Sequence, residues 1–148
     1  MDHSETSQAT HDDHLNLLAL LPLFAGLPWH ELERIAADLE EAFFPPGQSV
    51  LREGLGGPHL YVILDGQVAV LIAGMERARL GRGDFFGEVA ALLGGPPGAE
   101  VVAVAGPVRC LSLPAERLEE FLLDHPRVMF RMLQAEARRL HATNQWRT

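Results

Sequence analysis

The sequence predicts an α+β fold, in which a β jelly-roll barrel is flanked by N-terminal helices and a long C-terminal helix. Apolar residues recur at helical spacing before Pro45 and again after Pro114. Thirteen of the fourteen glycines lie between Gly47 and Gly106, where short apolar runs alternate with turn residues. Many short strands at close, regular spacing are typical of a jelly roll or a related β-sandwich.

The chain of 148 residues has room for one domain with a substantial core. We expect a disordered tail over residues 1–13 and a single domain over residues 14–148. Within that domain we expect helices over about 15–42, a β-roll over about 47–113 and C-terminal helices over about 115–144.

The composition excludes several classes of partner. The net charge is −8, every basic side chain is an arginine, and residues 1–46 are strongly acidic, so no basic face for nucleic acid is expected. The single cysteine, Cys110, lies in an apolar strand-like run, which rules out an internal disulfide and fits a reducing compartment. No signal peptide and no apolar run of membrane-spanning length is present, so we expect a cytoplasmic protein without a membrane segment.

The first residues are polar and have no periodicity, which is typical of disorder. The run His11-Asp12-Asp13-His14 could ligate a metal only if a third ligand and supporting hydrogen bonds held it. We favour a solvated tail and expect no metal site.

A first helical segment begins at Leu15, and a second helix is predicted to begin at Pro28, a residue that suits the first helical position. Its apolar residues fall at helical spacing: Leu32, Ile35, Ala36 and Leu39. Its acidic residues, which include Glu40 and Glu41, are interpreted as a solvated face.

Six strands are predicted in the central region: Ser49–Arg52, His59–Leu64, Gln67–Ile72, Ala78–Leu80, Val101–Ala105 and Val108–Leu113. The strongest turn signal is Asp65-Gly66, which predicts a two-residue hairpin because both residue types tolerate positive φ. Gly54 to Pro58 and Ala73-Gly74 mark further reversals of the chain.

Two helices follow the predicted strands. Pro114 begins the first, over Ala115–Leu123, and Asp124-His125-Pro126 separates it from a second that runs toward Asn144. An apolar stripe on the second consists of Met129, Met132, Leu133, Ala137 and Leu140. Such a stripe can be core packing or a dimer interface.

The stretch from Gly83 to Val101 combines a Gly-Asp turn, two aromatic residues, Gly87-Glu88 and an apolar run that ends in a Gly/Pro cluster. It predicts a short helical turn within a β-rich region, and the free N–H groups at the start of such a turn favour an anion. Gly87 allows close approach of the backbone, and Glu88 can accept hydrogen bonds from hydroxyl groups. An alternative interpretation is that Glu88 only stabilises the helix N-terminus.

The run F-G-E-V-A-A-L-L-G-G-P over residues 86–96 resembles the phosphate-binding cassette of the cyclic nucleotide-binding domain family. Residues 21–27, 46–54 and 60–70 also resemble that family, so the likeness extends over about residues 15–141. The resemblance implies the same fold and a cassette in which Glu88 accepts a hydrogen bond from a ribose hydroxyl. The implied ligand-binding residues are Phe86, Gly87, Glu88, Val89, Ala90, Pro97, Gly98, Ala99 and Glu100.

Two cassette positions differ from the family pattern. The family has an arginine that pairs with the cyclic phosphate. At the corresponding position this chain has Pro97 or, if its loop is one residue longer, Gly98. The small hydroxyl residue that follows is replaced by Ala99 or Glu100. A charge-assisted arginine–phosphate pair contributes about 1.5–3 kcal/mol, so we expect binding of cyclic nucleotides to be weakened tenfold to hundredfold or more.

No nucleophile elbow, P-loop or zinc-binding spacing is present, so we expect no enzyme. Two functions remain open. The chain is either a regulatory sensor for a weakly bound cyclic nucleotide or a nucleoside-like ligand, or a degenerate domain that serves as a dimerisation or protein-interaction scaffold. In the family the long C-terminal helix pairs with its twin, which favours a homodimer that acts on an unknown effector protein. Only residues 142–148 follow that helix, so no helix-turn-helix domain and no DNA binding are expected.

Overall fold

The computed structural model describes residues 13–51, 59–95 and 98–145. Three predictions fall wholly or mostly outside these residues. They are the disordered tail over residues 1–13, the possible metal-binding segment at residues 11–14 and the chain reversal at Gly54 to Pro58. The described elements are, in order, a helix over 13–20, α2 (Trp29–Asp38), β1 (Glu40–Phe44), β2 (Ser49–Leu51), β3 (His59–Ile72), β4 (Met75–Leu80), β5 (Phe85–Phe86), α3 (Glu88–Leu93), β6 (Glu100–Pro114), α4 (Ala115–Asp124) and α5 (Pro126–Gln145).

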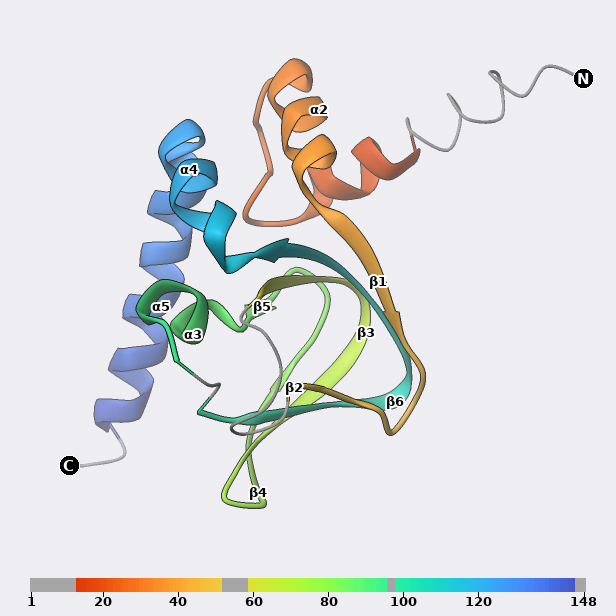
Figure 1. The fold of residues 1–148 in the computed structure, drawn as a ribbon, viewed down its shortest axis with the longest axis vertical. Coiled ribbons are helices and arrows are strands. Elements are labelled where there is room, and N and C mark those ends of the chain that lie inside the picture. Colours follow the sequence, from red (N-terminus) through yellow and green to blue (C-terminus); the bar gives the residue numbers. More distant parts are fainter. Residues whose placement is uncertain (1–12, 52–58, 96–97, 146–148) are drawn as a thin grey trace, which may run out of the picture.

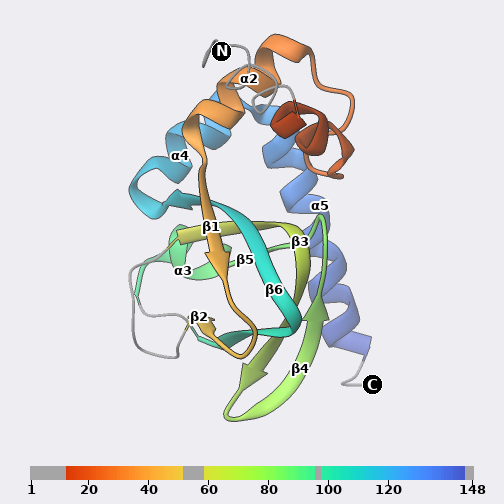
Figure 2. The same ribbon diagram turned by 90° about the vertical axis from the view of Figure 1, so that its right-hand side faces the viewer.

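The strands form one antiparallel sheet in the order β1-β6-β3-β4, with β2 also paired to β6 and β5 paired to β3. The two long strands, β3 and β6, curve together and give the sheet a jelly-roll-like shape that is not closed (Figures 1 and 2). The N-terminal helices cover one end of this roll, and α5 runs along its side (Figures 1 and 2). The predicted α+β jelly roll flanked by helices is confirmed.

The predicted helix that extends to residue 42 is wrong at its end. Helix α2 ends at Asp38, Leu39 is extended, and β1 follows immediately. Strand β1 pairs with β6 from Glu40 opposite Ser112 to Phe44 opposite Val108. The predicted helix has Glu41 on a solvated face, whereas in the structure the Glu41 carboxylate accepts a hydrogen bond from Arg109 across the strand pair. Pairing with a strand that lies 68 positions further along the chain overrides the local helical pattern.

The predicted hairpin at Asp65-Gly66 is also wrong, because β3 continues through it. Residues on both sides of Asp65-Gly66 pair with the same partner, β6, and only the register shifts there. The reversal predicted at Ala73-Gly74 is the true hairpin between β3 and β4, and both of its residues have positive φ angles, 52° and 77°. Asp65-Gly66 therefore accommodates a shift of register within the long curved strand β3. Glycine is common at such bulges.

Successive side chains of a strand point to opposite faces of the sheet, and this separates two core clusters. Phe85 packs into the larger cluster with the helices, whereas the adjacent Phe86 packs into the smaller cluster on the other face of the sheet. The smaller cluster contains the buried residues Ile63, Val68, Phe86, Val101, Ala103, Val108 and Cys110. Burial raises the pKa of the Cys110 thiol to about 12, so this sulfur stays protonated and packs as an apolar group.

The predicted apolar stripe on α5 divides between core and solvent. Met132 is buried together with Val128, whereas Leu133 and Leu140 are exposed. At the start of α5 the buried His125 ring lies 3.0 Å from a carboxylate oxygen of Glu31, which connects this helix to α2. No helix within the described part of the chain combines the length and apolar character that a membrane crossing requires.

Gly66 provides a test of this strand geometry. Its φ is +99°, and a Cβ at this position would lie 2.5 Å from the carbonyl oxygen of Pro107 on β6. We expect Gly66→Ala to lower the free energy of unfolding by about 2 kcal/mol or more, because both the backbone conformation and the contact are unfavourable. Chemical denaturation measures the change.

Gly81→Ala is the matched control, since its nearest neighbouring atom would be 3.9 Å away, an ordinary contact distance. It should change the free energy of unfolding by less than about 0.5 kcal/mol. Equal destabilisation by the two substitutions would contradict the assigned register.

Candidate functional site

The cassette begins where β5 passes into α3. Gly87 precedes the first helical residue with a φ of 84°, a left-handed conformation that side chains other than glycine rarely adopt. The Gly87 carbonyl then accepts a hydrogen bond of 3.2 Å from the Ala91 N–H. The short helical turn predicted within a β-rich region is therefore present, and the left-handed glycine sets the direction in which it starts.

Glu88 is the first residue of α3, and only 6% of it is exposed. Its Oε1 atom accepts a hydrogen bond of 3.1 Å from Nη1 of Arg139 on α5. Its Oε2 atom is buried and has no hydrogen-bond partner among the described residues. The carboxylate lies at the N-terminus of the helix, as the capping interpretation expects, but it also holds a cation from another element.

Arg139 is a further candidate site residue, which the cassette motif does not predict. Its Nη2 atom donates a 2.6 Å hydrogen bond to the Phe85 carbonyl, and its guanidinium carbon lies 4.4 Å from the centre of the Phe85 ring. Nη1 also donates to Glu136 at 3.1 Å, so one nitrogen serves two carboxylates. The spacing of Glu136 and Arg139, three positions apart on a helix, was the only local signal of this arrangement.

The surroundings of Glu88 favour its protonated form. Burial is the main cause that raises its pKa, and the charge of Glu136 adds to it, while the Glu88 backbone N–H and the Arg139 guanidinium act in the opposite direction. The balance raises the Glu88 pKa to about 7. Near neutral pH this carboxyl group can therefore either accept or donate a hydrogen bond.

The remaining predicted site residues are dispersed. Phe86 is buried and stacks on Tyr61 with ring centres 5.1 Å apart, Ala90 is buried, and Val89 is exposed. Glu100 is half-buried and begins β6 opposite Leu71. Gly98 is exposed, Ala99 is half-buried, and Pro97 lies outside the described residues.

Two arginines on other strands are engaged with carboxylates away from Glu88. Arg79 is paired with Glu76 at 2.5 Å, and Arg109 is paired with Glu41. Within residues 13–51, 59–95 and 98–145, no group of three or more His, Cys, Asp or Glu side chains could hold a metal ion. The cation closest to the cassette carboxylate is thus Arg139, which comes from a helix.

The raised pKa of Glu88 predicts how stability depends on pH. An unfolded glutamate ionises near 4.5, whereas folded Glu88 keeps its proton up to about pH 7. Unfolding therefore releases a proton between these values, and the Glu88 contribution to stability falls as pH rises through that window.

We expect the free energy of unfolding of the unaltered protein, relative to Glu88→Gln, to fall by up to about 3 kcal/mol between pH 4.5 and pH 8, at about 1.4 kcal/mol per unit of pKa shift. Urea titrations of both proteins at several pH values measure this difference. A difference that stays constant across the window would show that Arg139 holds Glu88 ionised throughout.

Comparisons with known proteins agree on one family. The sequence model of the cyclic nucleotide-binding domain matches residues 41–125. A cGMP-dependent protein kinase of Toxoplasma gondii is 34% identical over 125 residues, which cover 84% of this chain and 12% of the kinase. The structure of the Thermus thermophilus catabolite activator protein has 30% identity and a TM-score of 0.73, over 84% of this chain and 60% of that one.

A regulatory subunit of a cAMP-independent protein kinase A from Trypanosoma brucei has 25% identity and a TM-score of 0.77, over 97% of this chain and 51% of that one. A triple mutant of that subunit, in which one substitution introduces an arginine, has been solved with cAMP bound. The chain thus spans less than two thirds of each of these proteins. The matched family model, the fold and the cassette at residues 86–96 together show that this chain belongs to the cyclic nucleotide-binding domain family.

Proposed function

We propose that this chain is a non-catalytic sensor module that binds a ribose-bearing ligand at Glu88, with weakened affinity for cyclic nucleotides because the cassette lacks its phosphate-binding arginine. The observation that carries this proposal is the buried Oε2 atom of Glu88, which has no hydrogen-bond partner within the described residues. A buried acceptor without a donor costs about 1–3 kcal/mol. A ligand hydroxyl that donates to this oxygen would recover that free energy.

The phosphate half of the cassette supports the altered specificity. Gly98 carries no side chain, and Glu100 adds a negative charge at the start of β6. A cyclic phosphate would bind here without the bidentate, charge-assisted contact that an arginine supplies. The Trypanosoma brucei subunit, described as cAMP-independent, holds cAMP in a mutant with three substitutions, one of which introduces an arginine, and this supports a contribution of such a side chain to phosphate binding.

The same contacts suggest how the ligand would act on the rest of the protein. Arg139 joins Glu88 to α5 through Oε1, so a hydroxyl that donates to Oε2 would reorient the carboxylate that Arg139 contacts. Ligand binding would then change the free energy that holds α5 against the cassette. This helix is therefore the element through which we expect the signal to reach an effector protein.

Restoration of the arginine tests the phosphate part of the proposal. We expect the unaltered chain to bind cyclic AMP and cyclic GMP weakly in titration calorimetry. At least one of Gly98→Arg with Glu100→Thr, and Pro97→Arg with Glu100→Thr, should bind one of these nucleotides at least about tenfold more tightly, the scale of one charge-assisted pair.

Glu100→Thr alone separates the loss of a negative charge from the gain of an arginine, and it should account for only part of the effect. Glu88→Ala, added to the tighter-binding variant, should weaken binding again because it removes the ribose acceptor. Submicromolar binding of cyclic AMP or cyclic GMP by the unaltered chain would overturn the proposal of altered specificity.

A second candidate function, a dimerisation scaffold, is favoured by the exposed apolar side chains of α5. They are Met129, Phe130, Leu133 and Leu140. Exposed apolar residues that follow one another at helical spacing are typical of a helix that pairs with another helix. The two functions are compatible, because a dimer interface on α5 would place the ligand-sensitive helix between the protomers.

Leu133→Glu tests this interface. Leu133 is 63% exposed, so a charge at this position should leave the fold intact while it disrupts a helix–helix contact. In sedimentation at tens of micromolar we expect a dimer for the unaltered chain and a monomer for the variant. Leu123→Glu is the matched control on α4, since Leu123 is 65% exposed, and it should stay dimeric. A monomeric unaltered chain would refute the scaffold role.

A further inference from the structure

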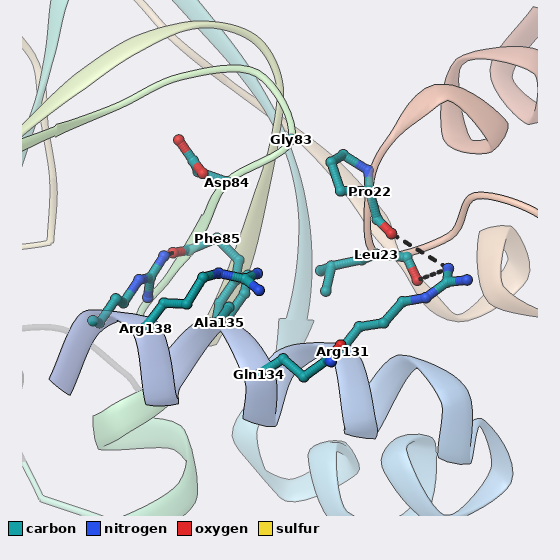
Figure 3. A pocket seen from close by; sticks show the side chains of 10 residues that line it. Pro22, Leu23, Gly83, Asp84, Phe85, Arg131, Gln134, Ala135 and Arg138 are labelled. Atoms are coloured by element: carbon teal, nitrogen blue, oxygen red, sulfur yellow. Dashed lines mark hydrogen bonds between the residues drawn. The ribbon is translucent and has the colours of Figure 1, made fainter. Parts of the chain in front are cut away.

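A cavity lies outside the cassette, between α5, the Pro22–Leu23 segment and the 83–85 turn (Figure 3). Its volume is about 480 Å³, within the range of about 300–1,000 Å³ that is typical of small-molecule sites. The wall on α5 includes Arg131, Gln134, Ala135 and Arg138, which fall on one face of the helix at intervals of three and four residues. The small side chain of Ala135 leaves space between the two arginines.

The cavity is positively charged. Arg131 donates hydrogen bonds to the carbonyl oxygens of Pro22, at 3.3 Å, and Leu23, at 3.1 Å, which orient its guanidinium group without neutralising it (Figure 3). Arg138 makes no hydrogen bond or ion pair with any described residue, and it extends from α5 along the cavity (Figure 3). Neither arginine is thus paired with a carboxylate in the described part of the chain.

The other charged groups of the cavity do not cancel this excess. Arg139 also lines it, and its charge is shared with Glu88 and Glu136. Asp84 is the one acidic residue of the described lining, and its Oδ2 atom accepts a 2.9 Å hydrogen bond from the Gly81 N–H. In Figure 3 the Asp84 carboxylate points away from the arginines that rise from α5. The arginines therefore present an excess of positive charge to a ligand.

We propose that this cavity binds a small molecule that carries an oligophosphate group, with Arg131 and Arg138 as its principal contacts. Their positions differ by seven residues, which places their backbones about 10 Å apart along the helix axis. Two long side chains at this separation can converge on adjacent phosphate groups, and the planar guanidinium group is suited to bidentate contacts with phosphate oxygens. Gln134, which lies between them on the same face, adds an uncharged hydrogen-bond donor.

An anion in this cavity would connect α5 to the N-terminal segment that already accepts hydrogen bonds from Arg131. It would also restrain Arg138, whose neighbour Arg139 contacts Glu88. The proposed site is therefore placed to stabilise α5 in the position that engages the cassette. It does not depend on the proposed function, because oligophosphate binding here requires no ligand at Glu88.

Titration calorimetry with inorganic tripolyphosphate on the full chain tests the site. We expect the unaltered protein to bind tripolyphosphate, and Arg138→Gln to weaken this binding about tenfold, the effect of one charge-assisted contact. The melting temperature of Arg138→Gln without ligand should stay unchanged, because Arg138 makes no hydrogen bond or ion pair with the described residues. Arg131→Gln should also weaken binding.

Arg127→Gln is the matched control, since it removes the same charge from an exposed position on α5 that does not line the cavity. It should alter the affinity by less than twofold. Equal loss of affinity in Arg127→Gln and Arg138→Gln would show that the affinity for tripolyphosphate depends only on the net charge of the protein. Unchanged affinity in Arg138→Gln would place the anion elsewhere, for example at the cassette, and absence of binding at millimolar tripolyphosphate would exclude the site. Each of these three results overturns the proposal.

Discussion

The contact of Arg139 with Glu88 and Phe85 is the interaction on which the arrangement of the cassette and α5 depends. A buried carboxylate needs a compensating charge, and here the charge comes from a helix that begins 38 positions after Glu88. The same guanidinium donates to the Phe85 carbonyl and lies over the Phe85 ring, so its position is fixed by β5 as well. Any change in the charge or hydrogen bonding of Glu88 therefore alters the free energy of α5 docking.

Local patterns predicted the elements whose conformation is determined by nearby residues. Pro28 and Pro114 lie immediately before the first residues of α2 and α4, and Ala73-Gly74 forms the hairpin that turn chemistry indicated. Predictions failed where a distant partner decides the conformation. Residues 40–42 continue the predicted helix in sequence but pair with β6. Asp65-Gly66 has turn chemistry, but the residues before and after it both pair with β6.

The same division applies to the site. The local geometry at Gly87 and Glu88 is predictable because it follows from one contiguous motif, a left-handed glycine before a helix that starts with a carboxylate. Arg139 was not identified, because its role depends on how closely α5 approaches β5, and no local pattern encodes a distance between elements. The cavity beside it could not be predicted either, since Arg131 is oriented by two carbonyl groups over a hundred positions earlier in the chain.

Under the proposed function, the electrostatics of the cassette would favour a neutral ligand over an anionic one. Glu88 and Glu136 share a single guanidinium nitrogen, so the carboxylates outnumber the cation that serves them. Burial and this excess of negative charge both raise the Glu88 pKa. The surroundings therefore already disfavour the negative charge of the Glu88 carboxylate itself. A phosphate in the same low-dielectric surroundings would meet similar resistance without a cassette arginine to offset it, whereas a ribose hydroxyl would bring a donor and no charge. In our proposal, the absence of an arginine at Pro97 or Gly98 and the raised pKa of Glu88 act in the same direction, against a phosphate and in favour of a ribose hydroxyl.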